Sequence, residues 1–155
     1  MSRINHVESV FHQFGERMGM GPLVLDSTDR VSLVFDGVLV TFAYSNEPIE
    51  LIWIYIDLGS VPEEGVAALQ TLLTIGFDSW AHNIMTIGLD DEGQNAVGYT
   101  SIAVSMLELP LLEEMVSRML QAASLIRSSV EEAAFEEAQA VVHTDGQAEA
   151  NWAKA

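Results

Sequence analysis

The strongest constraint on the architecture is one alternating run of residues, Leu51-Ile-Trp-Ile-Tyr-Ile-Asp-Leu58. Successive side chains of a β-strand point to opposite faces of its sheet, so this run separates an aliphatic face from a face that carries Trp53, Tyr55 and Asp57. Every position of the aliphatic face is Ile or Leu, and we expect that face to lie in the core. The aromatic face is a candidate contact surface.

Two strands are expected before this run. Asp36-Gly37 is a strong signal for a two-residue hairpin turn, and it separates the strand-like residues 31–35 from residues 38–45. A shorter strand-like run, residues 23–26, leads into the first of these strands. The three central strands are therefore expected to run antiparallel to their neighbours.

A second hairpin is expected later in the chain. Residues 84–89 and 96–104 both read as strands, and the acidic turn at residues 90–93 separates them.

Three segments have the 3.6-residue periodicity of amphipathic helices, namely residues 3–20, about 62–75 and about 110–142. The first has an apolar stripe of Ile4, Val7, Phe11, Phe14 and Met18. The glycines that follow it favour a C-cap, and Pro22 cannot continue the helix. The second and third segments each begin with Pro, which is favoured in a first helical turn.

The expected order is helix, three strands, helix, two strands, helix. This order predicts an α+β fold, a two-layer α-β-β-β-α-β-β-α domain with a twisted antiparallel sheet and flanking helices. A chain of 155 residues is most simply a single domain. We expect the domain to span residues 1–142 and a flexible C-terminal tail to span residues 143–155.

The chain is strongly acidic, with 23 Asp and Glu against 6 Lys and Arg and a net charge of −17. Between Arg30 and Arg118 there is no Lys or Arg, but there are thirteen acidic residues. Binding of nucleic acids or anionic membranes requires basic residues, so the composition argues against both classes of partner. The charge fits either simple solubility or a basic partner surface.

Cysteine is absent, which excludes disulfides and is compatible with a reducing compartment. The N-terminal sequence lacks the apolar segment of a signal peptide, and no apolar run approaches the ~20 residues that span a bilayer. We therefore expect a soluble cytoplasmic protein.

No pattern in the sequence predicts catalysis. The four histidines lack the spacing of a zinc site, and residues 90–93 lack the alternating ligands of a calcium loop. The glycines at residues 19–21 follow a helix instead of the strand that a dinucleotide-binding motif requires. We expect a protein that is not an enzyme, with no catalytic residue, no metal and no cofactor.

Three local patterns resemble those of a known family. They are the first helix ending in Gly before residues 23–26 and 31–36, the step Ile56-Asp-Leu-Gly-Ser-Val-Pro62 from strand to middle helix, and the Leu72-Leu73 pair in that helix. With the element order, size and acidity, they make the chain similar to the class I type III secretion chaperones, the Tir-chaperone family, over about residues 4–130. Residues 74–78 depart from the family, which often has Asn there, and the C-terminal part of the chain is longer than typical.

The resemblance implies a cytosolic homodimer that binds the N-terminal chaperone-binding segment of one or more type III secreted effectors. Binding would keep that segment soluble, partly unfolded and competent for delivery to the secretion apparatus. The ATPase of that apparatus is a further partner that the resemblance raises. No nucleotide or other cofactor is implied, because binding energy alone holds the client open.

The candidate partner-binding residues are Val34, Trp53, Tyr55 and Phe42, with Phe11 and Phe14 if the first helix flanks the binding groove. For the three phenylalanines, a place in the monomer core is an equally open alternative. For the dimer interface, the middle helix is expected to supply Leu69, Leu72, Leu73 and Trp80.

Three alternatives remain open. A regulatory protein of the same fold would bind a transcriptional antagonist, and its captured partner would be a cytosolic regulator. A small-molecule-binding α+β domain would enclose an apolar pocket between its sheet and its long helix. A YbjN-like domain has a similar element order and acidity without a role in secretion.

Overall fold

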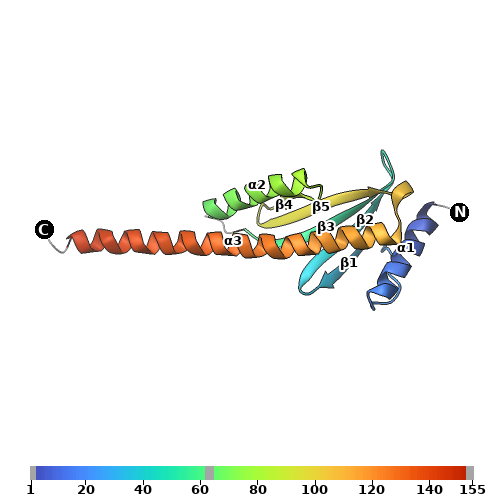
Figure 1. The fold of residues 1–155 in the computed structure, drawn as a ribbon, viewed down its shortest axis with the longest axis horizontal. Helices are drawn as coiled ribbons and strands as arrows, with labels where there is room; N and C mark the ends of the chain where they lie inside the picture. Colours follow the sequence, from blue (N-terminus) through green and yellow to red (C-terminus); the bar gives the residue numbers. More distant parts are fainter. Residues whose placement is uncertain (1–2, 62–64, 153–155) are drawn as a thin grey trace.

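The computed structural model describes residues 3–61 and 65–152, with side chains at residues 4–61 and 65–140. Its elements are α1 (Arg3–Arg17), β1 (Arg30–Phe35), β2 (Val38–Ser45), β3 (Leu51–Ser60), α2 (Val66–Ala81), β4 (Thr86–Leu89), β5 (Asn95–Ala103), a short 3-10 turn (Val104–Met106) and α3 (Leu109–Trp152) (Figure 1). The predicted α+β order is confirmed.

The five strands form one antiparallel sheet in the order β1-β2-β3-β5-β4. Strand β3, which contains the alternating residues 51–58, therefore lies at the centre, and β1 and β4 form the two edges. Asp36 and Gly37 both have positive φ, 48° and 82°, as a type I′ turn requires. The predicted hairpin is confirmed, with Phe35 opposite Val38.

The inner face of the sheet packs against α1 and α3. The four aliphatic residues of β3 are all buried, at most 3% exposed, as the alternation predicted. From α3, side chains one or two helical turns apart meet this face, and Leu112, Met119 and Ile126 are each at most 1% exposed. These side chains fill the core between the sheet and the long helix. Two hollows of about 330 and 360 Å³ lie between α3 and the end of the sheet near Asp36 and Gly59, and the small-molecule alternative stays a prediction.

The three phenylalanines that were candidate partner contacts lie in this core. Phe11 and Phe14 of α1 hold Phe42 of β2 between them, with ring centroids 5.3 Å and 5.8 Å apart, and none of the three is more than 1% exposed. Aromatic pairs at these separations stabilise a core beyond the area they bury. Their role is to fasten α1 to the sheet, and they present no surface to a partner.

Residues 23–26 do not form a strand. The Asp26 carboxylate accepts backbone N–H bonds from Thr28 at 2.7 Å and from Arg30 at 3.1 Å, and these bonds close a turn before β1 begins. The bonds from Thr28 come first among the causes that hold the pKa of Asp26 below its usual range. A short polar side chain that bonds its own backbone competes with strand pairing.

The helix boundaries also differ from the expected ones. Helix α1 ends at Arg17 and is followed by Gly19 with φ of 72°, the expected glycine cap. Helix α2 continues past the expected end near residue 75 to Ala81, and Gly76 within it lies beside Ile87 of β4. Its expected start at residues 62–64 lies outside the described residues.

Helix α3 runs beyond the sheet and alongside α2 (Figure 1). It continues to Trp152, whereas the helix was expected to end near residue 142. The flexibility expected for residues 143–155 stays a prediction, and residues 153–155 lie outside the described part.

One contact ties the far part of α3 to the start of α2. Gly65, the N-cap residue of α2, offers no side-chain acceptor, and Glu137 Oε2 accepts the backbone N–H of Ala67 at 3.1 Å instead. The first N–H groups of a helix lack partners within the helix, and a carboxylate also favours the positive end of the helix dipole. Glu137 thus caps α2, although it lies 70 residues after Ala67 in the sequence.

Candidate partner-binding surfaces

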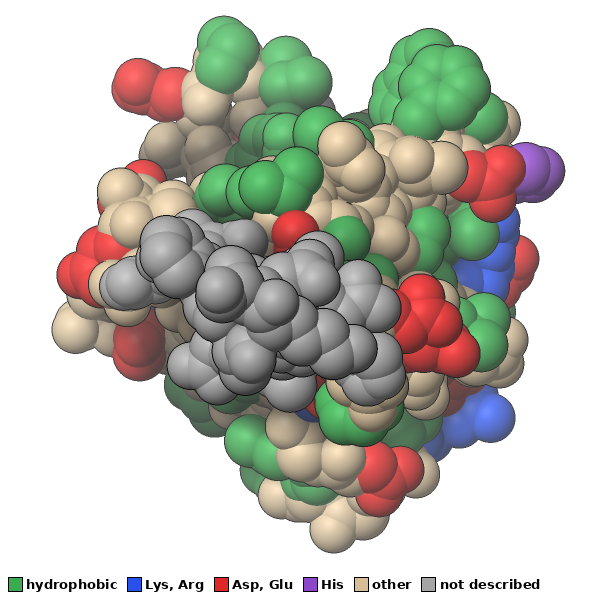
Figure 2. All heavy atoms as spheres, turned by 90° about the vertical axis from the view of Figure 1, so that its left-hand side faces the viewer, with side chains coloured by type: hydrophobic (Ala, Val, Ile, Leu, Met, Phe, Trp, Pro, Cys, Tyr) green, Lys and Arg blue, Asp and Glu red, His purple; other side chains and the backbone are tan. Residues whose placement is uncertain are grey.

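The exposed side of α2 carries a continuous apolar stripe. We call it the α2 stripe, and it consists of Val66, Leu69, Leu73, Phe77 and Trp80. Leu73, Phe77 and Trp80 remain 76%, 70% and 61% exposed. Figure 2 shows hydrophobic side chains standing out along the upper edge of the molecule, where α2 lies in Figure 1. Large apolar patches of this kind mark interaction sites on soluble proteins.

The stripe contains three of the four residues expected at a dimer interface. Leu69, Leu73 and Trp80 belong to it, whereas Leu72 is only 5% exposed and packs into the core. Neighbouring residues of a helix point about 100° apart, so the two leucines of the pair face different surroundings. Val66 and Phe77 were missed, although their spacing of three and four residues from the others would have indicated them.

The outer face of the sheet, opposite α1 and α3, carries an aromatic cluster. We call it the aromatic face, and it consists of Trp53, Tyr55 and Tyr99 with the flanking Val34 and Leu39. The three ring centroids lie 6.3 to 6.5 Å apart. Val34 and Leu39 face each other across the first hairpin and are 62% and 44% exposed. The cluster is therefore apolar and partly exposed.

The structure brings together Val34, Trp53 and Tyr55, three of the predicted partner-binding residues, on this aromatic face. Tyr99 joins them because it pairs with Tyr55 in the sheet. Tyr99 lies there because of the register between β3 and β5, and the sequence of β5 alone does not determine that register.

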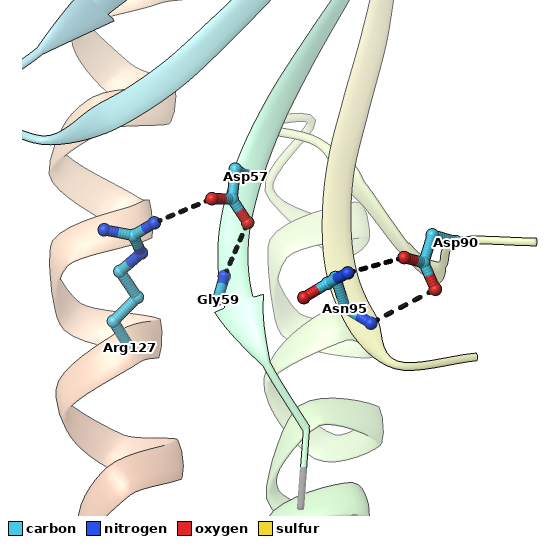
Figure 3. A network of polar contacts seen from close by, with 5 residues as sticks. All are labelled: Asp57, Gly59, Asp90, Asn95 and Arg127. Carbon is cyan, nitrogen blue, oxygen red and sulfur yellow. Dashed lines mark hydrogen bonds and ion pairs between the residues drawn. The ribbon is translucent and has the colours of Figure 1, made fainter. Parts of the chain in front are cut away.

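Figure 3 shows polar contacts at the end of β3 and at the β4–β5 turn. Asp57 accepts a bond from Arg127 Nη2 at 3.2 Å and from the Gly59 backbone N–H at 2.9 Å. Asp90 accepts bonds from Asn95, through its side-chain amide at 2.7 Å and its backbone N–H at 3.1 Å. The bonds from Asn95 are the main cause that holds the pKa of Asp90 below its usual range. These bonds favour the ionised form of Asp90 and close the β4–β5 turn.

The sequence matches the family model of the Tir chaperone protein (CesT) family over residues 9–127. The chain belongs to this family. The predicted family is thus confirmed. The family match ends before the part of α3 that contains Glu137. No curated protein matches the chain significantly.

Chains of several solved protein complexes share the fold of this Tir-chaperone family member. One chain of the HopA1–SchA chaperone–effector complex is 20% identical, with a TM-score of 0.69, and the match covers 83% of this chain and 97% of that chain. One chain of the ExsC–ExsE complex is 22% identical, with a TM-score of 0.70 over 83% and 96%. One chain of the ExoU–SpcU complex from the type III secretion system of Pseudomonas aeruginosa is 18% identical, with a TM-score of 0.59 over 81% and 98%.

Two further observations concern the described residues of this family member. No helix among them is both long enough and apolar enough to cross a membrane. Within the same residues, no group of three or more His, Asp or Glu side chains is placed to hold a metal ion.

Proposed function

We propose that this chaperone acts in the cytoplasm as a homodimer that holds the N-terminal segment of a secreted effector in extended form. The observation that carries the proposal is the coexistence of two separate apolar surfaces on a member of the Tir chaperone family. The α2 stripe is proposed to bind a second copy of the chain, and the aromatic face is proposed to bind the effector.

The α2 stripe suits a self-complementary contact. It is a single helical face, so a two-fold axis across it would pair each residue with a residue of the same stripe. Phe77 and Trp80, whose rings lie 6.0 Å apart, supply the large aromatic side chains that dominate most interfaces.

The aromatic face suits an extended polypeptide. Trp and Tyr are preferred residues at binding hot spots, and β1 at the sheet edge exposes strand hydrogen-bonding groups beside Val34. A disordered client loses roughly 2–5 kcal/mol of interaction energy to ordering, so its contact surface must be large. Binding of this kind requires no catalytic step. Recognition by the secretion-apparatus ATPase is a further proposal that rests on the family alone.

The experiment that tests this function is affinity capture from secreting cells with a matched pair of variants. Val34→Ser changes the aromatic face, and Val24→Ser changes an equally exposed valine, also 62%, outside the sheet. We expect wild type and Val24→Ser to capture the same secreted protein through its N-terminal segment. The double variant Val34→Ser/Tyr55→Ser should capture much less of that protein. Equal capture by all variants would remove the aromatic face from the site. A captured cytosolic regulator would favour the regulatory alternative instead.

A further inference from the structure

A hollow on the outer sheet face continues the aromatic face toward the β4–β5 turn. Its apolar floor is formed by Leu39, Tyr55 and Val97, which come from three adjacent strands. The hollow measures about 480 Å³, which is large enough for one or two side chains of a bound segment. An apolar floor of this size favours the burial of an aliphatic or aromatic side chain.

More acidic than basic side chains line this hollow. The acidic ones are Asp57, Asp90 and Asp91, and the basic one is Arg30. Asp57 is already paired with Arg127, and Asp90 is already used by the β4–β5 turn. The Asp91 side chain forms no hydrogen bond or ion pair with any residue in the described part of the chain, and it is exposed. Asp91 is therefore the carboxylate available to a ligand.

We propose that this hollow binds an apolar side chain of the effector that has Lys or Arg as its neighbour, with the basic group against Asp91. The inference rests on the proposed binding of the effector at the aromatic face, and it specifies the chemistry of the bound segment. Charge complementarity is the argument for this occupant, because the hollow belongs to a chain with a net charge of −17. An acidic neighbour at this position would be repelled by Asp91.

The test uses a phage-displayed library of random dodecapeptides as the probe. Immobilised wild-type protein should enrich peptides in which a basic residue adjoins an apolar one. Asp91→Asn should reduce this preference, whereas Glu92→Gln should retain it, because Glu92 makes the same charge change in the same turn but does not line the hollow. The best peptide should bind Asp91→Asn about two- to fivefold more weakly than wild type, the range for one exposed ion pair. This difference should shrink in 0.5 M NaCl, where salt screens the pair (the Debye length is about 10 Å at 0.1 M).

Three other results would contradict the proposed binding chemistry of the hollow. Peptides that bind through Tyr55 without a basic preference would overturn the inference and leave the proposed function standing. Equal losses in Asp91→Asn and Glu92→Gln would also overturn it, because net charge alone would then explain the preference. No enrichment of any peptide would count against both the inference and the proposed use of the aromatic face.

Discussion

The α2 stripe makes a quantitative prediction for Leu73→Ser. Full burial of a Leu side chain is worth about 1.5–3 kcal/mol, and 76% of Leu73 is still exposed in the monomer. Burial of Leu73 in the proposed dimer therefore contributes about 1–2 kcal/mol per copy. A two-fold interface contains both copies, so the substitution should cost about 2–4 kcal/mol of association free energy. This corresponds to a roughly 30- to 1,000-fold rise in the dimer Kd.

The assay is sedimentation equilibrium or light scattering over a dilution series. Leu125→Ser is the matched control, because Leu125 is also a helical leucine, 71% exposed, but it lies on α3 outside the stripe. Both variants should keep the stability of the folded monomer, since both side chains are largely in solvent. Wild type and Leu125→Ser should remain dimers near twice 16.9 kDa at concentrations where Leu73→Ser is a monomer. A monomeric wild type, or equal weakening by both variants, would refute the reasoning.

Three further predictions concern the fold. Phe42→Ala should lower the free energy of unfolding by about 3–5 kcal/mol, and Tyr55→Ala should lower it by about 1 kcal/mol or less. Urea titrations at one fixed protein concentration measure both values. Similar losses in the two variants would contradict the assignment of Phe42 to the core. Glu137→Ala should lower the free energy of unfolding by about 1 kcal/mol and should speed hydrogen exchange at the Ala67 amide. Glu137→Gln keeps an acceptor and should lower the free energy of unfolding by less. Unchanged exchange at Ala67 in Glu137→Ala would exclude the cap. The pKa of Asp90 is lower in the folded state than in the unfolded state, where it is about 4. Asp90 therefore stabilises the fold fully at pH values above the unfolded-state pKa, and this stabilisation is lost as the pH falls through the folded-state pKa. The stability gap between wild type and Asp90→Ala should therefore be present at pH 7 and should close in acid, and a gap independent of pH would contradict this cause.

Local patterns predicted most of the fold because their signals depend on near neighbours. Strand alternation assigned the buried face of β3 correctly, and Asp36-Gly37 fixed the first hairpin through its positive φ values. The same reasoning failed at residues 23–26, where the side chain of Asp26 accepts bonds from the backbone N–H groups of Thr28 and Arg30 and closes a turn in place of a strand.

The surfaces were harder to predict because exposure depends on what packs on the other side. Leu72 and Leu73 are identical neighbours, but only the contact of α2 with α3 and β4 determines that Leu72 is buried and Leu73 exposed. Phe42 and Trp53 both belong to apolar strands, but only Phe42 faces α1.

The sequence by itself determined the α+β order, the acidic character, the family and the two faces of the central strand, since these follow from composition, periodicity and short motifs. Only the tertiary structure decided which apolar residues remain at the surface. It also decided that Tyr99 lies beside Tyr55 and that Glu137 caps a helix whose first turn is 70 residues away in the sequence. The physical reason is that sheet register and helix packing unite residues that are distant along the chain. Their contact energies then select one arrangement among several that the local patterns allow.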